Sequence, residues 1–115
     1  MITSYFLVET NSLIYAYRAG GPELLDVYRR VARAKGQEFA ISKTIEAEIV
    51  KGPLKHELGQ YLADRKIKIL DAPESEERAR SDPEKFSKYA GKRSLLEIAA
   101  REHAEGRGVV ILSDD

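Results

Sequence analysis

Residues 5–17 constrain the fold more than any other stretch of the chain. Residues 6–8, Phe-Leu-Val, form an apolar run that is typical of a strand buried on both faces, as in a parallel sheet. Glu9 ends this run, and Thr10 with Asn11 makes a good helix start. The stretch therefore predicts a strand, an acid and a helix in direct succession. In an open parallel sheet, ligands gather just beyond the carboxyl ends of the strands, which is the expected position of Glu9.

Three further apolar segments, 39–41, 66–70 and 109–112, predict strands that are separated by helical patterns. Helices are expected from Thr10 to about residue 19, from Pro22 to a C-cap at Gly36, over 43–51 after a cap at Ser42, from Pro53 onward, around 84–89, and from Ser94 to about Gly106. Residues 71–82 are polar and acid-rich, and we expect a mobile loop there, with a single helical turn as the alternative. The alternation predicts a single α/β domain over residues 1–115 with a central, mostly parallel sheet of about four strands between helices. The last strand is expected to be central. Because it ends at the final residues, we also expect a short tail to be missing after Asp115.

The composition limits the chemistry. Nineteen basic and nineteen acidic residues cancel, so no overall field attracts nucleic acid or an anionic membrane. The chain has no cysteine and only two histidines, which excludes thiolate catalysis and the usual zinc sites and leaves a hard cation on oxygen ligands as the expected metal. No signal peptide or membrane span is recognisable, so we expect a cytoplasmic protein without a membrane partner.

Carboxylates are the candidate functional groups. Glu9 and the pair Asp114 and Asp115 follow apolar strands, and parallel strands would bring them to one edge of the sheet. Glu48 and Glu97 lie on helices that could lean over that edge. Clustered carboxylates repel one another unless a cation neutralises them, and Mg²⁺ or Mn²⁺ is the natural occupant. A water activated there would attack phosphorus in line.

Each acid also has a simpler interpretation. Glu97 follows Ser94 by three residues, a capping-box pattern in which it would bond back to its own helix start. Glu48 competes with Glu46 as the inward-facing acid of its helix. Asp114 and Asp115 would point to opposite faces of an extended strand, so at most one of them faces inward.

Four stretches, taken in order, resemble the PIN-domain nucleases and, among these, the VapC-type toxins of bacterial toxin–antitoxin pairs. They are residues 7–16 (strand, acid, Thr-Asn, helix), 41–48 (the segment with the second acid), 91–99 (the helix with the third) and 110–115 (the closing strand with Ser-Asp-Asp). The register of the second stretch favours Glu48 over Glu46. This chain departs from the family in having glutamate at positions 9 and 97, where aspartate is usual. It also has Lys92 where some relatives carry an acid, and it lacks the usual final segment.

The resemblance implies a three-layer PIN-like fold and hydrolysis of RNA phosphodiester bonds. It implies a catalytic centre of Glu9, Glu48, Glu97 and Asp115, with Asp114 as the alternate, around Mg²⁺ or Mn²⁺. It also implies that Thr10, Asn11 and Ser113 orient the carboxylates or a bound water, and it gives an antitoxin partner and a homodimer. RNA contacts would come from nearby basic residues, for which the candidates are Lys43, Lys51, Lys92 and Arg93.

Three other functions remain open on the sequence. A nuclease for structured DNA would need an arch or a long basic insertion, which the chain lacks. A phosphoacceptor receiver also places acids at strand ends, and Asp71 fits that pattern, but no lysine closes the last strand. The third is a PIN-like module that has lost catalysis and binds RNA or a protein.

Overall fold

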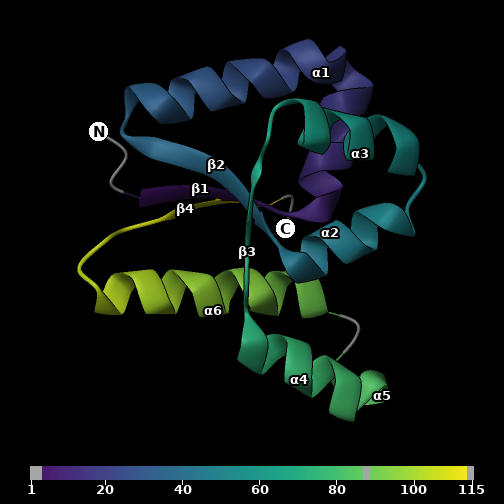
Figure 1. Ribbon diagram of the computed structural model, residues 1–115, viewed down its shortest axis with the longest axis vertical. Helices are drawn as coiled ribbons and strands as arrows, with labels where there is room; N and C mark the ends of the chain where they lie inside the picture. The colour runs from purple at the N-terminus through teal and green to yellow at the C-terminus, as the bar shows by residue number, and fades with distance from the viewer. Residues whose placement is uncertain (1–3, 87–88, 114–115) are drawn as a thin grey trace.

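The computed structural model describes residues 4–86 and 89–113 and has an α/β architecture (Figure 1). Its elements, in chain order, are β1 (Ser4–Val8), α1 (Thr10–Ala34), β2 (Gln37–Ser42), α2 (Lys43–Val50), α3 (Lys55–Asp64), β3 (Lys68–Leu70), α4 (Pro73–Ser81), α5 (Pro83–Phe86), α6 (Ala90–Ala104) and β4 (Val110–Leu112).

The sheet has the strand order β3-β2-β1-β4, and every pairing is parallel. Leu7 of β1 lies opposite Ala40 of β2 and Ile111 of β4, so β1 is an interior strand. Leu7 and Val8 point to opposite faces of the sheet and are both fully buried, which means that both faces of β1 are covered. The predicted α/β class with a four-stranded parallel sheet is therefore confirmed.

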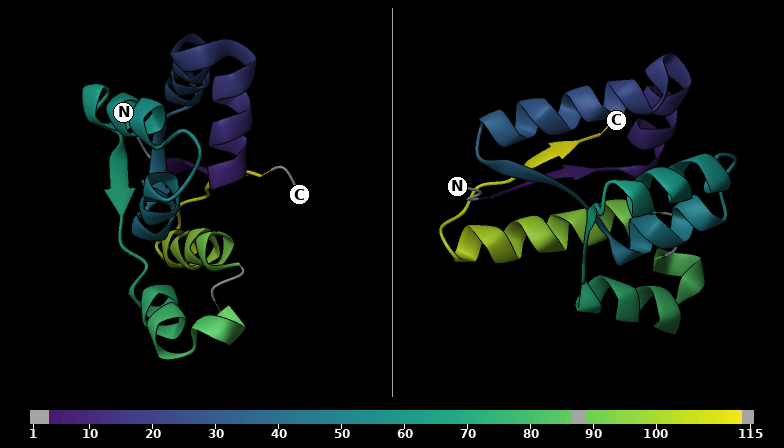
Figure 2. Two further views of the ribbon diagram at one scale, coloured as in Figure 1. Left: turned by 90° about the vertical axis from the view of Figure 1, so that its right-hand side faces the viewer. Right: turned by 45° about the horizontal axis from the view of Figure 1, so that its top comes forward.

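Helices cover both faces of the sheet. Figure 1 shows α1 on one side of β1 and β2 and α6 on the other, and Figure 2 shows the same layering from two further directions. Helix α3 packs near α1, whereas α4 lies on the outer side of α6 together with α5. This layering is consistent with the three-layer fold that the resemblance implies.

Helix α1 bends where the sequence predicted a break between two helices. Gly21 has φ 66° and ψ −161°, a conformation that a residue with a Cβ rarely adopts, and Pro22 follows it. The part of α1 after the bend runs back along the sheet and has its C-cap at Lys35, one residue before the expected Gly36, which follows with a φ of 75°. Because Gly21 is not helical, α1 consists of two helical segments, as predicted, the first beginning beside the carboxyl end of β1 and the second finishing near the start of β2.

The prediction of a loop over residues 71–82 is wrong, because Pro73–Ser81 forms helix α4. No residue of α4 is buried, so the helix has no apolar stripe for a periodicity argument to detect. Polar contacts stabilise α4 instead. Pro73 occupies the first turn, Glu76 accepts a 2.8 Å bond from the backbone N–H of Ala72, and Arg78 pairs with Glu74 at 3.0 Å.

Two other expectations about the C-terminal part need correction. The last helix begins at Ala90 and not at Ser94, which is a buried residue inside α6. Strand β4 lies at the edge of the sheet and not at its centre, and the side chain of Val110 is 43% exposed. An uninterrupted apolar run does not distinguish a central strand from an edge strand that has one protected face.

Within the described residues, no helix combines the length and the apolar character that crossing a bilayer requires.

Candidate active site at the carboxyl edge of the sheet

Glu9 lies where β1 passes into α1. Its backbone N–H donates to the carbonyl of Leu112 at 3.0 Å, which extends the β1–β4 ladder by one bond, and its own carbonyl accepts the N–H of Leu13 as the first bond of α1. The Ser113 hydroxyl donates a 2.6 Å bond to Oε2 of Glu9. The carboxylate is therefore held at the carboxyl edge of the sheet, and Oε1 has no hydrogen-bond partner within the described ranges.

Glu48 approaches the same edge from α2. The hydroxyl of Thr10, the residue after Glu9, donates a 2.7 Å bond to Oε1 of Glu48. The carboxylate also lies directly against Gly91 of α6, where an added Cβ would collide with it. This hydrogen bond places the Glu48 carboxylate beside the start of α1, whose first residue follows Glu9 in the sequence.

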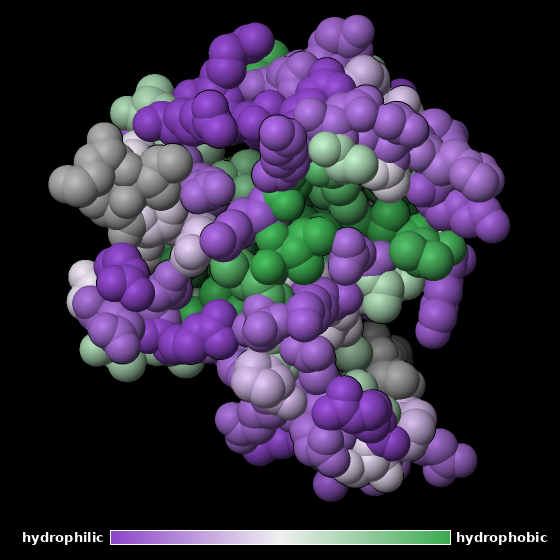
Figure 3. Space-filling model, viewed as in Figure 1, coloured by the Kyte–Doolittle hydropathy of each residue, from purple (hydrophilic) through white to green (hydrophobic). Residues whose placement is uncertain are grey.

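Glu46, the alternative acid on α2, points away from this edge. Glu46 lines a small apolar depression between α2, α3 and β3, whose other lining side chains include Ile49, Val50, Leu62 and Ile69. Figure 3 shows apolar atoms gathered in the middle of the face that β3 crosses in Figure 1. Glu48 is therefore the α2 acid that accompanies Glu9.

A buried chain of hydroxyl groups fixes α2 relative to α6. Ser42 caps α2 by accepting the N–H of Ile45 at 3.1 Å, as predicted, and its oxygen lies 2.6 Å from that of Ser94. Ser94 donates to the carbonyl of Gly91 at 2.5 Å. Since each hydroxyl carries one proton, Ser42 must donate to Ser94. The relay holds Gly91 against Glu48. The sequence predicted Ser42 and Ser94 only as helix caps, and it predicted no contact for Gly91.

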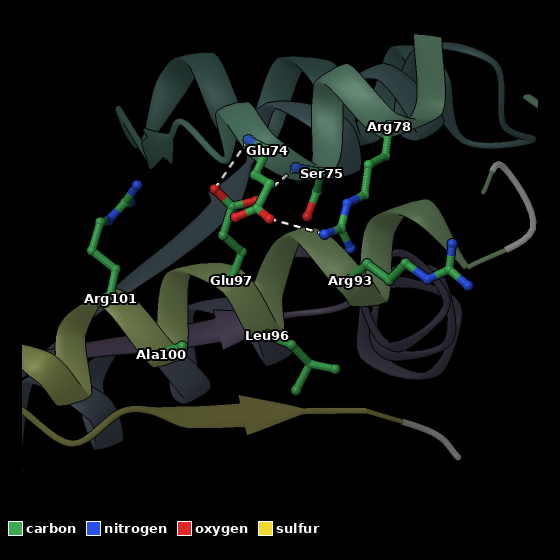
Figure 4. Close-up of a pocket in the computed structure, with 8 residues that line it drawn as sticks. All are labelled: Glu74, Ser75, Arg78, Arg93, Leu96, Glu97, Ala100 and Arg101. Carbon is green, nitrogen blue, oxygen red and sulfur yellow. Dashed lines mark hydrogen bonds and ion pairs between the residues drawn. The ribbon is translucent and has the colours of Figure 1, made fainter. Parts of the chain in front are cut away.

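Glu97 does not join Glu9 and Glu48. Its Oε2 accepts the N–H of Glu74 at 3.2 Å and its Oε1 accepts the N–H of Ser75 at 2.7 Å, so both oxygens bind the first turn of α4 (Figure 4). Burial acts to raise the pKa of Glu97, but these hydrogen bonds, chiefly those from Ser75, outweigh it and lower the pKa. The capping-box prediction is also wrong, because Glu97 caps α4 and not its own helix.

Glu97 lines an open groove of about 650 Å³ between α4 and α6, which we call the α4/α6 groove. Figure 4 shows Arg78 and Arg93 near one end, Arg101 near the other, and Leu96 and Ala100 on α6. Arg101 donates to the carbonyl of Asp71 at 2.9 Å. The guanidinium of Arg93 lies 4.8 Å from the centre of the Phe86 ring. The groove is a feature distinct from the edge that carries Glu9.

The remaining predicted site residues differ in their exposure and in their partners. Lys43 forms a 2.8 Å ion pair with Asp71, which lowers the pKa of that aspartate, so its charge is already engaged. Lys51 and Asn11 are exposed, and Lys92 is partly buried. The terminal acids Asp114 and Asp115 lie outside the described residues.

Metal binding can be judged from the donor set. Within residues 4–86 and 89–113, no three acidic, histidine or cysteine side chains come together in a way that could hold a metal. Glu9 and Glu48 provide two carboxylates, each oriented by a hydroxyl on one oxygen. Mg²⁺ is commonly held by one or two carboxylates while it keeps several waters, so carboxylates of this kind are the ligand type that suits a hard, largely hydrated cation.

Comparison of the chain with family models, with curated proteins and with solved structures found no match.

Proposed function

We propose that this protein is a metal-dependent endoribonuclease that hydrolyses RNA phosphodiester bonds at the carboxyl edge of its sheet. The observation that carries the proposal is that two acids from distant parts of the chain belong to the same edge of the sheet. Glu9 follows β1, and Glu48 accepts a hydrogen bond from Thr10, the first residue of α1. Acidic side chains at the ligand-binding edge of a parallel sheet favour a cation and, with it, an anionic substrate.

Mg²⁺ or Mn²⁺ at this edge would activate a water for attack on phosphorus. Glu9, Glu48 and the terminal acids Asp114 or Asp115 would be its ligands. Thr10 and Ser113 each bind one carboxylate oxygen at 2.6–2.7 Å, and this fixes the direction of the other oxygen. Glu97 receives a different role from the one the resemblance implies: it positions α4 beside α6.

The resemblance also supplies a cellular context as part of the proposal. The protein would be the toxin of a toxin–antitoxin pair, act in the cytoplasm, form a homodimer and be neutralised by a cognate antitoxin. A small DNA-binding protein encoded next to this gene would support that context.

The test is cleavage of single-stranded RNA by the wild type with Mg²⁺ or Mn²⁺, compared with Glu9→Gln, Glu48→Gln and Asp115→Asn. We expect each variant to lose at least about a hundredfold in rate. Glu46→Gln is the matched control, because it removes the same charge from the same helix but faces the α3 side. Cleavage without a divalent cation, or full activity in Glu9→Gln, would refute the proposal.

A second candidate is a PIN-like module that binds RNA without cutting it. The position of Glu97 favours it, because the third acid of the expected centre is committed to α4. RNA binding by a chain that cleaves no RNA under any divalent cation would establish this candidate over the nuclease.

A further inference from the structure

A depression of about 470 Å³ between the second half of α1 and the end of α3 is lined only by charged side chains. These are Asp26, Arg29, Arg30, Arg33, Asp64 and Arg65. Four arginines face two aspartates in a chain whose total charge is zero, so positive charge is concentrated here. We call these six residues the α1/α3 arginine cluster.

The two aspartates of the cluster are used inside the protein. Asp26 accepts bonds from Arg65 at 3.2 and 3.0 Å and from the Tyr61 hydroxyl at 2.8 Å, and it lies 3.7 Å from Arg29. Asp64 accepts a 2.7 Å bond from Gln60. The guanidinium of Arg65 also lies 4.6 Å from the centre of the Tyr61 ring. These contacts hold two arginines in fixed positions that a ligand does not have to order.

Arg30 and Arg33 carry the charge that the protein does not compensate. Both are exposed, and neither has a carboxylate partner within residues 4–86 and 89–113. They are one helical turn apart, where like charges repel each other. An anion bound between them would remove that repulsion, and guanidinium groups bind phosphate oxygens in a bidentate manner.

The cluster is remote from the candidate active site. Arg33 lies four residues before β2 and Arg65 three residues before β3, so both are near the amino ends of strands, whereas Glu9 follows the carboxyl end of β1. The six residues of β2 separate the two edges by roughly 20 Å at 3.3 Å per residue.

We propose that the α1/α3 arginine cluster binds the phosphodiester backbone of single-stranded RNA at a site separate from the acidic edge. Among the residues that the structure describes, the lining has no apolar or aromatic side chain to receive a base or a lipid, and its open, charged surface suits consecutive phosphates. The proposal takes RNA as the ligand from the proposed function. It adds that RNA long enough to span both edges is held at two places.

The test measures binding of a fluorescein-labelled single-stranded RNA of about 20 nucleotides by anisotropy, in magnesium-free buffer and in a Glu9→Gln background. Arg30→Gln/Arg33→Gln should weaken binding roughly tenfold and reduce the slope of log affinity against log salt by about 1.4, at ~0.7 per phosphate. Arg18→Gln/Lys55→Gln is the matched control, since it removes two exposed positive charges outside the cluster and should change affinity less than about twofold. Thermal unfolding monitored by circular dichroism verifies that the variants are folded.

Equal weakening by the two double variants would overturn the proposal, because binding would then follow total charge. Absence of RNA binding by the wild type, or full displacement of the RNA by equimolar inorganic triphosphate, would also overturn it, the latter by identifying a small-phosphate site. Because cleavage is not measured, the result is independent of the nuclease test. RNA binding through the cluster by a chain that does not cleave RNA would refute the nuclease and retain the cluster.

Discussion

The hydroxyl of Thr10 donates a 2.7 Å hydrogen bond to Oε1 of Glu48, a residue 38 positions further along the chain. The bond crosses from the first turn of α1 to the last turn of α2 and is the direct connection between the Glu9 and Glu48 parts of the candidate site. Thr10→Val keeps the shape of the side chain and removes its donor. We expect RNA cleavage to fall about 10–100-fold, because Glu48 loses its orientation, while the free energy of unfolding changes by about 1 kcal/mol or less. Cleavage rates and urea unfolding measure the two effects. Thr44→Val on α2 is the control, because within residues 4–86 and 89–113 its hydroxyl does not donate to Glu9 or Glu48. Unchanged cleavage in Thr10→Val would show that the bond has no role in activity.

Gly91 permits the close approach of α6 to Glu48. A Cβ at this position would collide with the Glu48 carboxylate and come within 2.8 Å of the Ile45 side chain. We expect Gly91→Ala to destabilise the protein by about 1–3 kcal/mol, because the packed neighbours must move. Gly59→Ala is the control in α3: no atom lies within 4 Å of the added methyl group, so we expect about 0.5–1 kcal/mol of stabilisation from helix propensity alone. Urea unfolding measures the free energy of unfolding of both variants. Stabilisation by Gly91→Ala would contradict the close contact of α6 with Glu48 and Ile45.

Glu97 should act on α4 and not on the chemistry. Glu97→Ala removes the acceptor of two backbone N–H groups at the start of α4, and loss of such a cap costs about 0.5–2 kcal/mol. We expect faster hydrogen exchange for amides of α4, with exchange in β1 and β2 unchanged. If Glu97→Ala instead loses metal-dependent cleavage while the amides of α4 stay protected, Glu97 belongs to the catalytic centre.

Asp26 should make stability depend on acid pH. The hydrogen bond from Arg65 is the largest cause that lowers its pKa from 3.8, with a further bond from Tyr61, and burial opposes them. Because the folded-state pKa is lowered, the stabilisation is complete above the unfolded value and is lost as the pH falls through the folded value. Asp26→Asn should therefore cost about 1–2 kcal/mol at neutral pH, and the difference from wild type should shrink below pH ~3.8. Urea unfolding across this range is the measurement, and a difference that does not change with pH would exclude Asp26 as its source.

The sequence predicted the elements that bury apolar side chains. Residues 6–8 and 39–41 are apolar runs, and both became interior strands because only a covered sheet can hide such runs on two faces. Helix α4 was missed because its support comes from Glu97, whose position 23 residues after Glu74 no local pattern reveals. The edge position of β4 was missed for a similar reason, since strand order depends on which long-range pairings form.

The candidate site was predicted in part. A strand end indicated the position of Glu9, and the family resemblance suggested Thr10 and Ser113 as orienting residues. The spacing of Ser94 and Glu97 indicated a helix start that does not exist, because α6 begins four residues earlier, where Gly91 fits against Glu48. The direction of a side chain near the end of a helix depends on tertiary contacts. Such contacts turn Glu48 toward Thr10, Glu46 toward α3 and Glu97 toward α4.

The pairing of β1 with β4 has a consequence for biosynthesis. Val8 lies opposite Leu112, so the ladder on that side of β1 can close only after residues 110–112 have been synthesised. Until those residues leave the ribosome, that side of β1 has no strand partner, while β2 can already pair with the other side. A nascent chain in this state cannot place Ser113 on Glu9, so this part of the acidic edge forms more than a hundred residues after Glu9 itself is made, since 104 positions separate the two residues.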